Sequence, residues 1–387
     1  MSEEIVLITG GNGFLGQHLV KVLQERDESI TEIRIVDLNP FVNKTGCVER
    51  IPIRSYIHDI SDINGENDMA FKGVSCVFHC AAYVSYEYPP DTTVLNRINV
   101  EGTRNIVKLC LKYEIRTLIY TSSAEACIKP YFRSGFFSLI INQTESKALP
   151  PNNSSQFVFG SYAESKLKAE ILVLAADNTP FSSGRGNLHT LAIRPTLMYG
   201  EGDTKLIPSL MTIGNYCHQT FYRIAGQGGR QQLSYAGNVA WAHVCARTAM
   251  KNRPNDIRGL PLFITDDTQI DDILYFCKKI TTPPNSSQPN FRVSSWYLPA
   301  IFSYIIALLI DIIYSVIFTH FKMKRLPFSF KTIVTFLGSI VFFSRLRATV
   351  YLDYTPLYSV KDAMKYSYPH YILWSNPAIN NKKVLSH

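Results

Sequence analysis

The chain has 387 residues, a formal net charge of +8, 18% charged residues and 12% aromatic residues. This composition fits a globular protein with one strongly apolar element, and the length leaves room for more than one domain. The sequence has no run of five like charges and no nucleic-acid-binding motif, which excludes the usual classes of DNA- and RNA-binding protein. Anionic lipid is the better partner for the positive charge.

The eight cysteines form no CxxC pair, which predicts reduced thiols in a reducing compartment. We expect no cleavable signal peptide before the first strand. Short apolar runs alternate with helical periodicity from the N-terminus onward, which predicts an α/β protein with a Rossmann-type, doubly wound parallel sheet. The expected strands are residues 5–9, 33–37, 74–80, 117–121, 188–194 and 262–265, and the expected helices include residues 14–24 and 99–113.

A glycine-rich segment, ITGGNGFLG, lies between the first expected strand and the first helix. Gly10, Gly13 and Gly16 have the spacing that lets a backbone approach a pyrophosphate at a helix N-terminus. The bare glycine pattern is weak by itself, but its position after a strand and before a helix is what dinucleotide binding requires. We therefore predict a nicotinamide-dinucleotide site here.

Asp37 ends the second expected strand, about twenty residues after the glycines. A carboxylate there accepts hydrogen bonds from the adenosine ribose and repels a 2′-phosphate, so it favours NAD over NADP. Arg34 and Arg50 lie near enough in sequence to leave that choice open. Asp59 follows the third strand, where a carboxylate can bond the adenine amino group, although a solvent-facing loop residue is nearly as plausible.

Tyr162 and Lys166 stand four residues apart in SYAESK, which places a phenol and an ammonium on one helix face. A neighbouring ammonium, together with the positive nicotinamide of NAD⁺, stabilises a phenolate, so we expect the pKa of Tyr162 to be lowered and Tyr162 to accept a hydroxyl proton. Ser123 ends an earlier strand and can hydrogen-bond the substrate oxygen, with Ser122 as the alternative. Asn99 is either a simple helix N-cap or a proton-relay amide.

Two stretches, residues 129–160 and 178–187, look like irregular insertions, and residues 283–289 look like a linker. Residues 297–318 then form an apolar run with Asp311 as its one charge, long enough to cross a bilayer. A second apolar run, residues 328–344, is a poor span because Lys331 and Gly338 interrupt it.

The chain on both sides of these apolar runs is expected to belong to one folded unit. We therefore expect a monotopic anchor facing the cytosol, with Asp311 near headgroups or against protein. The predicted domains are an NAD-binding core, a substrate-binding region and an anchor. They comprise residues 1–195 with later strands from about 233–267, residues 196–295 with 321–375, and residues 296–318.

Taken together, TGGNGFLG, VFHCAA, NVEGT, YTSS, YxxxK and IRP resemble the extended short-chain dehydrogenases. The later segments RPTLMYGEGD, YAGNVAWAH, FITDDT and YLDYTPLYS resemble the 3β-hydroxysteroid dehydrogenase/Δ5–Δ4 isomerase family within them. The resemblance runs from residue 5 to about residue 366. It implies an NAD-dependent enzyme that oxidises the 3β-hydroxyl of a steroid or sterol.

By this resemblance, Ser123, Tyr162 and Lys166 are the catalytic triad, and Gly10, Gly13, Gly16, Asp37 and Lys166 hold NAD. The family's isomerase step is attributed partly to an acidic pair, which corresponds to Asp266 and Asp267 here. Two positions depart from the family pattern: Ser161 replaces the proline before the catalytic tyrosine, and Ile270 replaces a histidine. These departures leave dehydrogenation expected and isomerisation open.

Three alternatives remain from the sequence. One is a 4-carboxysterol 3-dehydrogenase whose product loses CO₂, and another is a C27 3β-hydroxysterol dehydrogenase. The third belongs to a different class, a non-catalytic NAD-binding membrane scaffold. The resemblance also implies an endoplasmic reticulum membrane with the catalytic domain in the cytosol, or else a mitochondrial membrane. It is compatible with a homodimer, and it implies a steroid and membrane lipid as partners.

Overall fold

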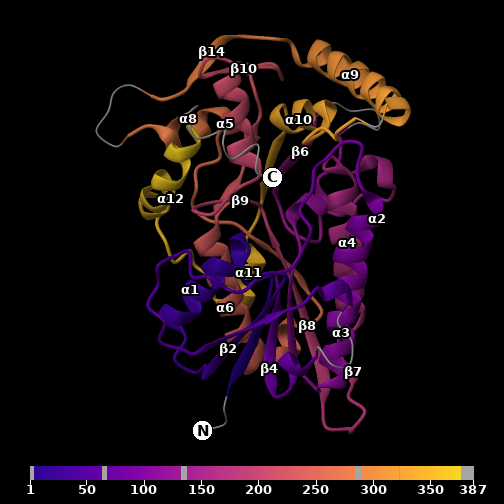
Figure 1. Cartoon of the computed structure of the whole chain (residues 1–387), viewed down its shortest axis with the longest axis vertical. Coiled ribbons are helices and arrows are strands. Elements are labelled where there is room, and N and C mark those ends of the chain that lie inside the picture. The colour runs from indigo at the N-terminus through magenta and orange to yellow at the C-terminus, as the bar shows by residue number, and fades with distance from the viewer. Residues whose placement is uncertain (1–3, 63–67, 132–136, 284–288, 322, 376–387) are drawn as a thin grey trace.

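The computed structural model describes residues 4–62, 68–131, 137–283, 289–321 and 323–375. A parallel sheet flanked by helices fills the lower half of the molecule in Figure 1. A smaller set of helices and short strands lies above it, and α9 (Ala300–Phe321) lies across the top.

The central sheet contains seven parallel strands in the order β13-β8-β5-β4-β1-β2-β3. The order reverses between β1 and β4, so the loops leaving their carboxyl ends diverge and open a crevice there. This arrangement confirms the Rossmann-type prediction. The strands are β1 (Ile5–Thr9), β2 (Glu32–Asp37), β3 (Ile53–Ile57), β4 (Val74–His79), β5 (Thr117–Thr121), β8 (Asn187–Pro195) and β13 (Pro261–Ile264).

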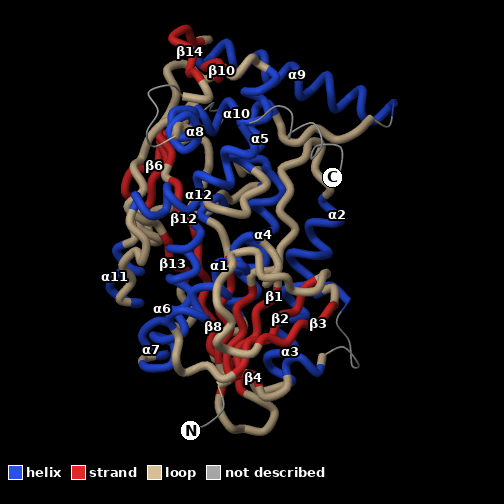
Figure 2. Tube along the Cα trace, turned by 60° about the vertical axis from the view of Figure 1, so that its left-hand side comes forward, coloured by secondary structure: helices blue, strands red, loops and turns tan. Residues whose placement is uncertain are grey.

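Apolar residues on both faces of each strand explain why the sheet is buried between two helix layers. Val6 and Ile8 of β1 pack in one core with α1 (Phe14–Arg26) and α6 (Ala236–Asn252). Leu7, on the opposite face, packs with α3 (Thr103–Lys112) and α4 (Gly160–Ala175). Figure 2 shows the sheet from the side, with helices on both faces.

The expected helix at residues 99–113 begins earlier than its periodicity indicates. The helical path starts with α2 (Thr92–Leu95), where the Asp91 carboxylate accepts a hydrogen bond from the Val94 N–H at 3.1 Å. It continues through a π-helical segment, Asn96–Gly102, into α3. The N-cap interpretation of Asn99 is therefore wrong, because Asn99 lies inside the helix and the Asp91 carboxylate caps its start.

The upper region forms from segments far apart in the sequence. β6 (Leu139–Gln143) comes from the expected insertion at residues 129–160, and it pairs with β15 (Ile340–Phe343), which also pairs with β11 (Arg230–Gln231). Residues 284–288 of the expected linker lie outside the described residues. The other elements of this region are β9 (Leu197–Tyr199), α5 (Leu206–Tyr216), β10 (Thr220–Arg223), β12 (Leu233–Tyr235), α8 (Ile273–Thr281), β14 (Arg292–Tyr297) and α12 (Val360–Ser375).

Short elements complete the lower half. The turn expected at residues 178–187 joins β7 (Thr179–Pro180) to β8 in an antiparallel pair, and α7 (Pro254–Ile257) and α11 (Leu346–Leu352) pack near α6.

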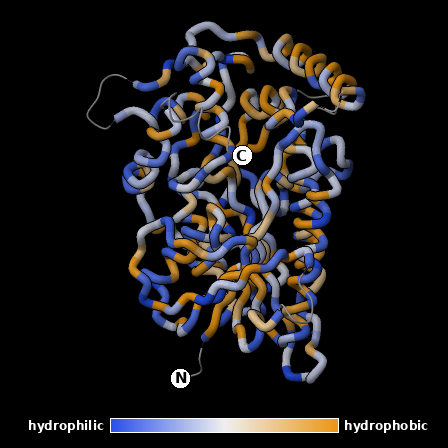
Figure 3. The backbone as a smooth tube through the Cα atoms, in the orientation of Figure 1, coloured by the Kyte–Doolittle hydropathy of each residue, from blue (hydrophilic) through white to orange (hydrophobic). Residues whose placement is uncertain are grey.

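Helix α9 exposes its apolar residues and buries a narrow stripe of small and polar residues. Ser303, Ala307 and Asp311 are its buried positions, spaced four apart, whereas Ile306, Leu309 and the other large apolar side chains of the helix are exposed or half-buried. Figure 3 shows α9 as a continuous apolar rod at the edge of the molecule. By length and hydropathy α9 is a candidate membrane segment, and it is the one such helix in the described ranges.

The second apolar run, residues 328–344, belongs to the folded protein. It forms α10 (Phe330–Leu337) and then β15, which pairs with strands of the upper region. Asp311 of α9 faces the start of α10, where its carboxylate accepts hydrogen bonds from the backbone N–H groups of Phe330 at 3.0 Å and Lys331 at 3.1 Å. The expectation that Asp311 lies against protein therefore agrees with the structure.

Replacing Asp311 with alanine should destabilise the upper region, because α10 would lose the acceptor for its first N–H groups. Loss of such a cap costs about 0.5–2 kcal/mol, a fall in Tm of a few degrees for a chain of this size. The measurement is thermal unfolding in detergent, with Asp267→Ala as the exposed-carboxylate control. An unchanged Tm would mean that α9 does not lie against α10 in the protein.

Candidate active site

The glycine loop between β1 and α1 is packed too closely for side chains. Gly10 has a φ of +72°, and a Cβ on it would lie 2.7 Å from the Ala81 Cα. A Cβ on Gly16 would lie 2.2 Å from the Gly10 carbonyl oxygen, and one on Gly13 would lie 3.2 Å from the same atom. The loop therefore brings backbone N–H groups and the N-terminus of α1 to the crevice above the sheet, the arrangement that binds a pyrophosphate.

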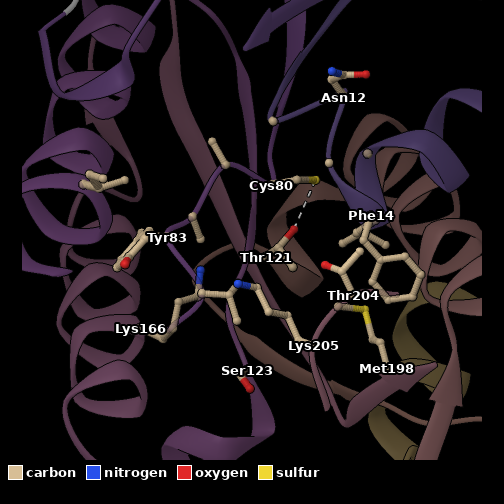
Figure 4. A pocket seen from close by; sticks show the side chains of 18 of the residues that line it. Asn12, Phe14, Cys80, Tyr83, Thr121, Ser123, Lys166, Met198, Thr204 and Lys205 are labelled. Atoms are coloured by element: carbon tan, nitrogen blue, oxygen red, sulfur yellow. Dashed lines mark hydrogen bonds between the residues drawn. The ribbon is translucent and has the colours of Figure 1, made fainter. Parts of the chain in front are cut away.

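One large cavity runs along this crevice, with a volume of about 590 Å³. That size suits a small organic ligand or part of a dinucleotide. The residues predicted from sequence to bind the cofactor or carry the chemistry line it together: Gly10, Gly13, Gly16, Asp37, Asp59, Ser122, Ser123, Tyr162 and Lys166. Figure 4 shows Lys166 and Ser123 reaching this cavity from different elements, with Asn12 and Phe14 of the glycine loop on another side.

Asp37 holds the glycine loop in place as well as facing the cavity. Its carboxylate accepts hydrogen bonds from the backbone N–H groups of Asn12 at 3.0 Å and Asn39 at 3.3 Å. Asp59, which also lines the cavity, pairs with Arg97 at 3.2 Å. Both carboxylates thus stand where an adenosine could be bound.

The side chains of Arg34 and Arg50, which left the choice between NAD and NADP open, are hydrogen-bonded to other parts of the chain. Arg34 donates to the backbone carbonyls of Ala70 and Lys72, and Arg50 donates to the carbonyls of Gln24 and Asp27. Neither lines the cavity, so neither is placed to hold a 2′-phosphate. This geometry fits NAD.

Replacing Asp37 with serine should narrow the preference for NAD over NADP by about 10- to 100-fold, because ribose hydrogen bonds are lost and repulsion of a 2′-phosphate is relieved. Dissociation constants of NADH and NADPH, obtained from the fluorescence of their reduced nicotinamide, would measure this preference. Asp267→Ser, outside the cavity, is the control. Equal affinity of the unaltered protein for both nucleotides would contradict the assignment.

Tyr162 and Lys166 lie on α4 and are both buried. The Lys166 Nζ lies 4.4 Å from the ring centroid of Tyr120, and burial lowers the pKa of Lys166 to about 7. Burial, together with the nearby Glu125, raises the pKa of Tyr162 rather than lowering it. The protein alone therefore does not lower the pKa of Tyr162, because desolvation of the phenol has a larger effect on this pKa than the charge of Lys166.

The two serines after β5 have different surroundings. The Ser123 hydroxyl oxygen accepts a hydrogen bond from the Glu125 N–H at 3.1 Å, and among the described residues its own proton has no acceptor, which leaves it available to a ligand. The Ser122 hydroxyl is buried without a partner among the described residues. Asn99 bridges Tyr83 and α4, because its amide bonds both backbone groups of Tyr83 and donates to the Ser165 hydroxyl at 2.9 Å.

Glu125 is a cavity residue that the sequence argument missed. Its side chain is buried, and one carboxyl oxygen accepts a hydrogen bond from the Tyr86 hydroxyl at 2.8 Å. The other oxygen has no partner among the described residues. Burial raises the pKa of Glu125 to about 7. Its place two residues after Ser123 was the available signal, since a short turn there returns a side chain to the strand's carboxyl end.

The acidic pair, Asp266 and Asp267, does not lie with the residues that line the cavity. The Asp266 carboxylate is buried and accepts hydrogen bonds from the Tyr235 N–H, the Asn238 side chain and the Thr268 N–H at 2.7–3.0 Å. Asp267 is exposed and pairs with Arg345 at 2.6 Å. Neither lines the cavity that holds Tyr162.

Solved structures of other proteins share this fold. MoeE5 in complex with UDP-glucuronic acid and NAD matches with a TM-score of 0.63 at 18% identity, covering 96% of this chain and 98% of that one. A UDP-glucose 4-epimerase of Thermus thermophilus, in complex with NAD, matches with a TM-score of 0.61 at 17% identity, covering 95% and 98%. These likenesses show the fold alone.

Sequence relatives are more specific. The 3beta-hydroxysteroid-dehydrogenase/decarboxylase isoform 1 of Arabidopsis thaliana is 27% identical, over 94% of this chain and 79% of that protein. The 3 beta-hydroxysteroid dehydrogenase/Delta 5-->4-isomerase of vaccinia virus (strain Western Reserve) is 32% identical, over 68% of this chain and 71% of that protein. The sequence profile of the 3-beta hydroxysteroid dehydrogenase/isomerase family matches residues 7–292. The prediction of an NAD-dependent oxidoreductase is confirmed at this level, and the chain belongs to the 3-beta hydroxysteroid dehydrogenase/isomerase family.

Proposed function

We propose that this protein oxidises the 3β-hydroxyl of a steroid or sterol, with NAD as the hydride acceptor. The observation that supports this most directly is the shared cavity, which brings Ser123, Tyr162 and Lys166 to the same space as the glycine loop and Asp37. A scaffold that only bound NAD would have no need for a buried phenol, ammonium and hydroxyl at that place.

Each residue has a distinct role in this proposal. Ser123 donates its free hydroxyl proton to the substrate oxygen and orients it. Tyr162 accepts the hydroxyl proton, and the positive charge of Lys166 on the same helix stabilises the phenolate that the transfer requires. Bound NAD⁺ supplies the acceptor for the hydride that leaves the carbinol carbon.

A second step, migration of the double bond from Δ5 to Δ4, is supported by Glu125. A 3-oxo-Δ5 steroid has an acidic proton at C4, and a carboxylate can take that proton and return it to C6 with no net change in composition. Glu125 is the carboxyl group beside Tyr162 with a free oxygen and a pKa near neutrality. We therefore assign the acid–base role to Glu125 in place of Asp266 and Asp267.

The cellular setting is part of the same proposal. The exposed apolar side of α9 is suited to lie in one leaflet of the endoplasmic reticulum membrane, with the cavity on the cytosolic side. Residues 1–195 with later strands form the NAD-binding part, and residues 196–295 with 321–375 form the substrate-binding part. The substrate would then reach the protein from the lipid phase.

The test is a product assay on the full chain in detergent or vesicles. NAD⁺ is supplied with a Δ5-3β-hydroxysteroid, a C27 3β-hydroxysterol or a 4-carboxysterol, and nicotinamide absorbance is followed before the products are identified by mass spectrometry. Nicotinamide reduction with any of the three supports the proposed oxidation, and a Δ4 ketone supports isomerisation. A decarboxylated or unisomerised ketone as the one product would decide for the alternatives, and no reduction with any alcohol would overturn the proposal.

A further inference from the structure

The loop that follows β4, residues 83–91, is called here the tyrosine loop. Tyr83, Val84 and Tyr86 of this loop line the cavity. Tyr86 donates its hydroxyl proton to Glu125, and its ring packs edge-on against Tyr162 with centroids 5.3 Å apart. One side chain of the loop therefore contacts both groups to which the proposed chemistry assigns proton transfers.

The outer half of the tyrosine loop is bound to the chain that leaves α9. Tyr88 and Leu326 exchange two backbone hydrogen bonds of 2.9 and 2.8 Å. The Arg325 guanidinium pairs with Asp91 at 2.7 Å, and Ser315 of α9 lies close to the Tyr88 hydroxyl. Tyr88 is two residues from Tyr86, so little chain separates the α9 contact from the catalytic contact.

A second set of contacts joins α9 to Tyr86 from the other side. Asp311 of α9 holds the start of α10. Phe336 of α10 packs on Phe159 with ring centroids 5.1 Å apart, and Phe159 packs on Tyr86 at 5.7 Å. Tyr86 is thus held from two sides, by its own loop and by Phe159 packed on α10. Both the tyrosine loop and α10 are in turn held by contacts to α9 or to the chain that leaves it.

We propose that Tyr86 is a positioning residue that orients Glu125 and Tyr162, and that α9 fixes its place through the tyrosine loop. The inference rests on the proposed function for its chemical meaning, but the contacts themselves do not depend on the substrate. The buried Glu125 carboxylate has Tyr86 as its one side-chain donor among the described residues, so its titration is sensitive to that donor.

To assign a change in the pKa of Glu125 to one neighbour, the charged and titratable groups around Glu125 must be known. Tyr86 comes from the tyrosine loop, Tyr162 and Lys166 from α4, and Asp203 lies near Tyr86 at the start of α5. The Asp203 carboxylate accepts hydrogen bonds from the Lys205 N–H at 2.8 Å and the Tyr371 hydroxyl at 2.9 Å. Tyr86 is therefore the direct hydrogen-bond donor to Glu125.

The first arm of the test needs no substrate. The carboxyl band of Glu125 is isolated as the infrared difference between the protein and Glu125→Gln, and it is titrated with pH in the full chain. Tyr86→Phe removes the proton donor to the ionised form, so the titration midpoint should rise by about one pH unit. Tyr83→Phe is the matched control, because no hydrogen bond of its hydroxyl is found in the described part of the chain. An unmoved midpoint in Tyr86→Phe would overturn the proposal.

The second arm tests the link to α9 by charge reversal. Arg325→Asp should lower the rate of oxidation of a vesicle-dissolved 3β-hydroxysteroid by about two- to fivefold, and Arg325→Lys, which keeps a positive charge beside Asp91, should keep most of that rate. Arg345→Asp, which breaks the distant pair with Asp267, is the control. An equal loss of rate in Arg325→Lys, or no loss in Arg325→Asp, would refute the part assigned to α9.

The two arms separate this inference from the proposed function. An inactive unaltered protein would refute the proposed function, while the infrared midpoint would still decide the role of Tyr86. A midpoint that moves in Tyr86→Phe and in Arg325→Asp, but not in Tyr83→Phe or Arg345→Asp, is the result that supports the whole inference.

Discussion

Replacing Tyr162 with phenylalanine is expected to lower the turnover of alcohol oxidation by a factor on the order of 10²–10⁴, with NAD binding retained. The variant lacks the hydroxyl that accepts the substrate proton, but it keeps the ring that packs against Tyr86. Steady-state turnover with saturating NAD⁺ measures the loss, and the fluorescence of added NADH measures the retained nucleotide binding.

Tyr199→Phe is the matched control, because Tyr199 is also buried and hydrogen-bonded, at 2.9 Å to Thr268, but lies outside the cavity. Lys166→Ala should also move the rise of oxidation to higher pH, since the phenolate of Tyr162 loses its charge partner. If Tyr162→Phe kept most of its turnover, the assignment of the general base would be wrong.

Replacing Glu125 with glutamine should abolish most of the isomerisation, by a similar factor of about 10²–10⁴, while oxidation continues. The 3-oxo-Δ5 intermediate would then accumulate, which mass spectrometry and ultraviolet absorbance can follow. The active form of the base is the carboxylate. Because the pKa of Glu125 is raised to about 7, the unaltered rate should increase as the pH rises through 7.

The same experiment on Asp266→Asn and Asp267→Asn distinguishes the two assignments. Asp266 holds backbone and side-chain donors, so its loss should reduce stability and all activities together. Asp267 is exposed and should have little effect. Accumulation of the intermediate in these variants, but not in Glu125→Gln, would return the isomerase role to the acidic pair.

The lower half of the molecule could be predicted closely from its sequence. Strands such as β1 and β5 are continuous apolar runs between segments with helical periodicity. The glycine loop between β1 and α1 has one plausible geometry. The π-helical segment before α3 could not, because its wide turns break the 3.6-residue period on which the prediction depends. Asn99 therefore looked like a helix start.

The upper region was less predictable because its strands are short and pair over long distances. β11 has two residues and β15 has four, too few for an alternating pattern to stand out. At the site, local spacing was enough to bring Tyr162 and Lys166 together as a hypothesis. For Glu125 the one local signal was its place two residues after Ser123, because its contact with Tyr86 joins two loops 39 residues apart and cannot be predicted from either loop alone.

The pairing of β6 with β15 has a consequence for the order in which the chain can fold. About two hundred residues separate these strands, so during synthesis β6 cannot pair with β15 until residue 343 has left the ribosome. β13, the last strand of the Rossmann sheet, ends at residue 264 and can complete that sheet much earlier. Truncation before α9 would therefore leave β6 and β11 without their partner strand β15. A more soluble enzyme should instead be made by polar substitutions on the exposed side of α9, with the C-terminal segment kept.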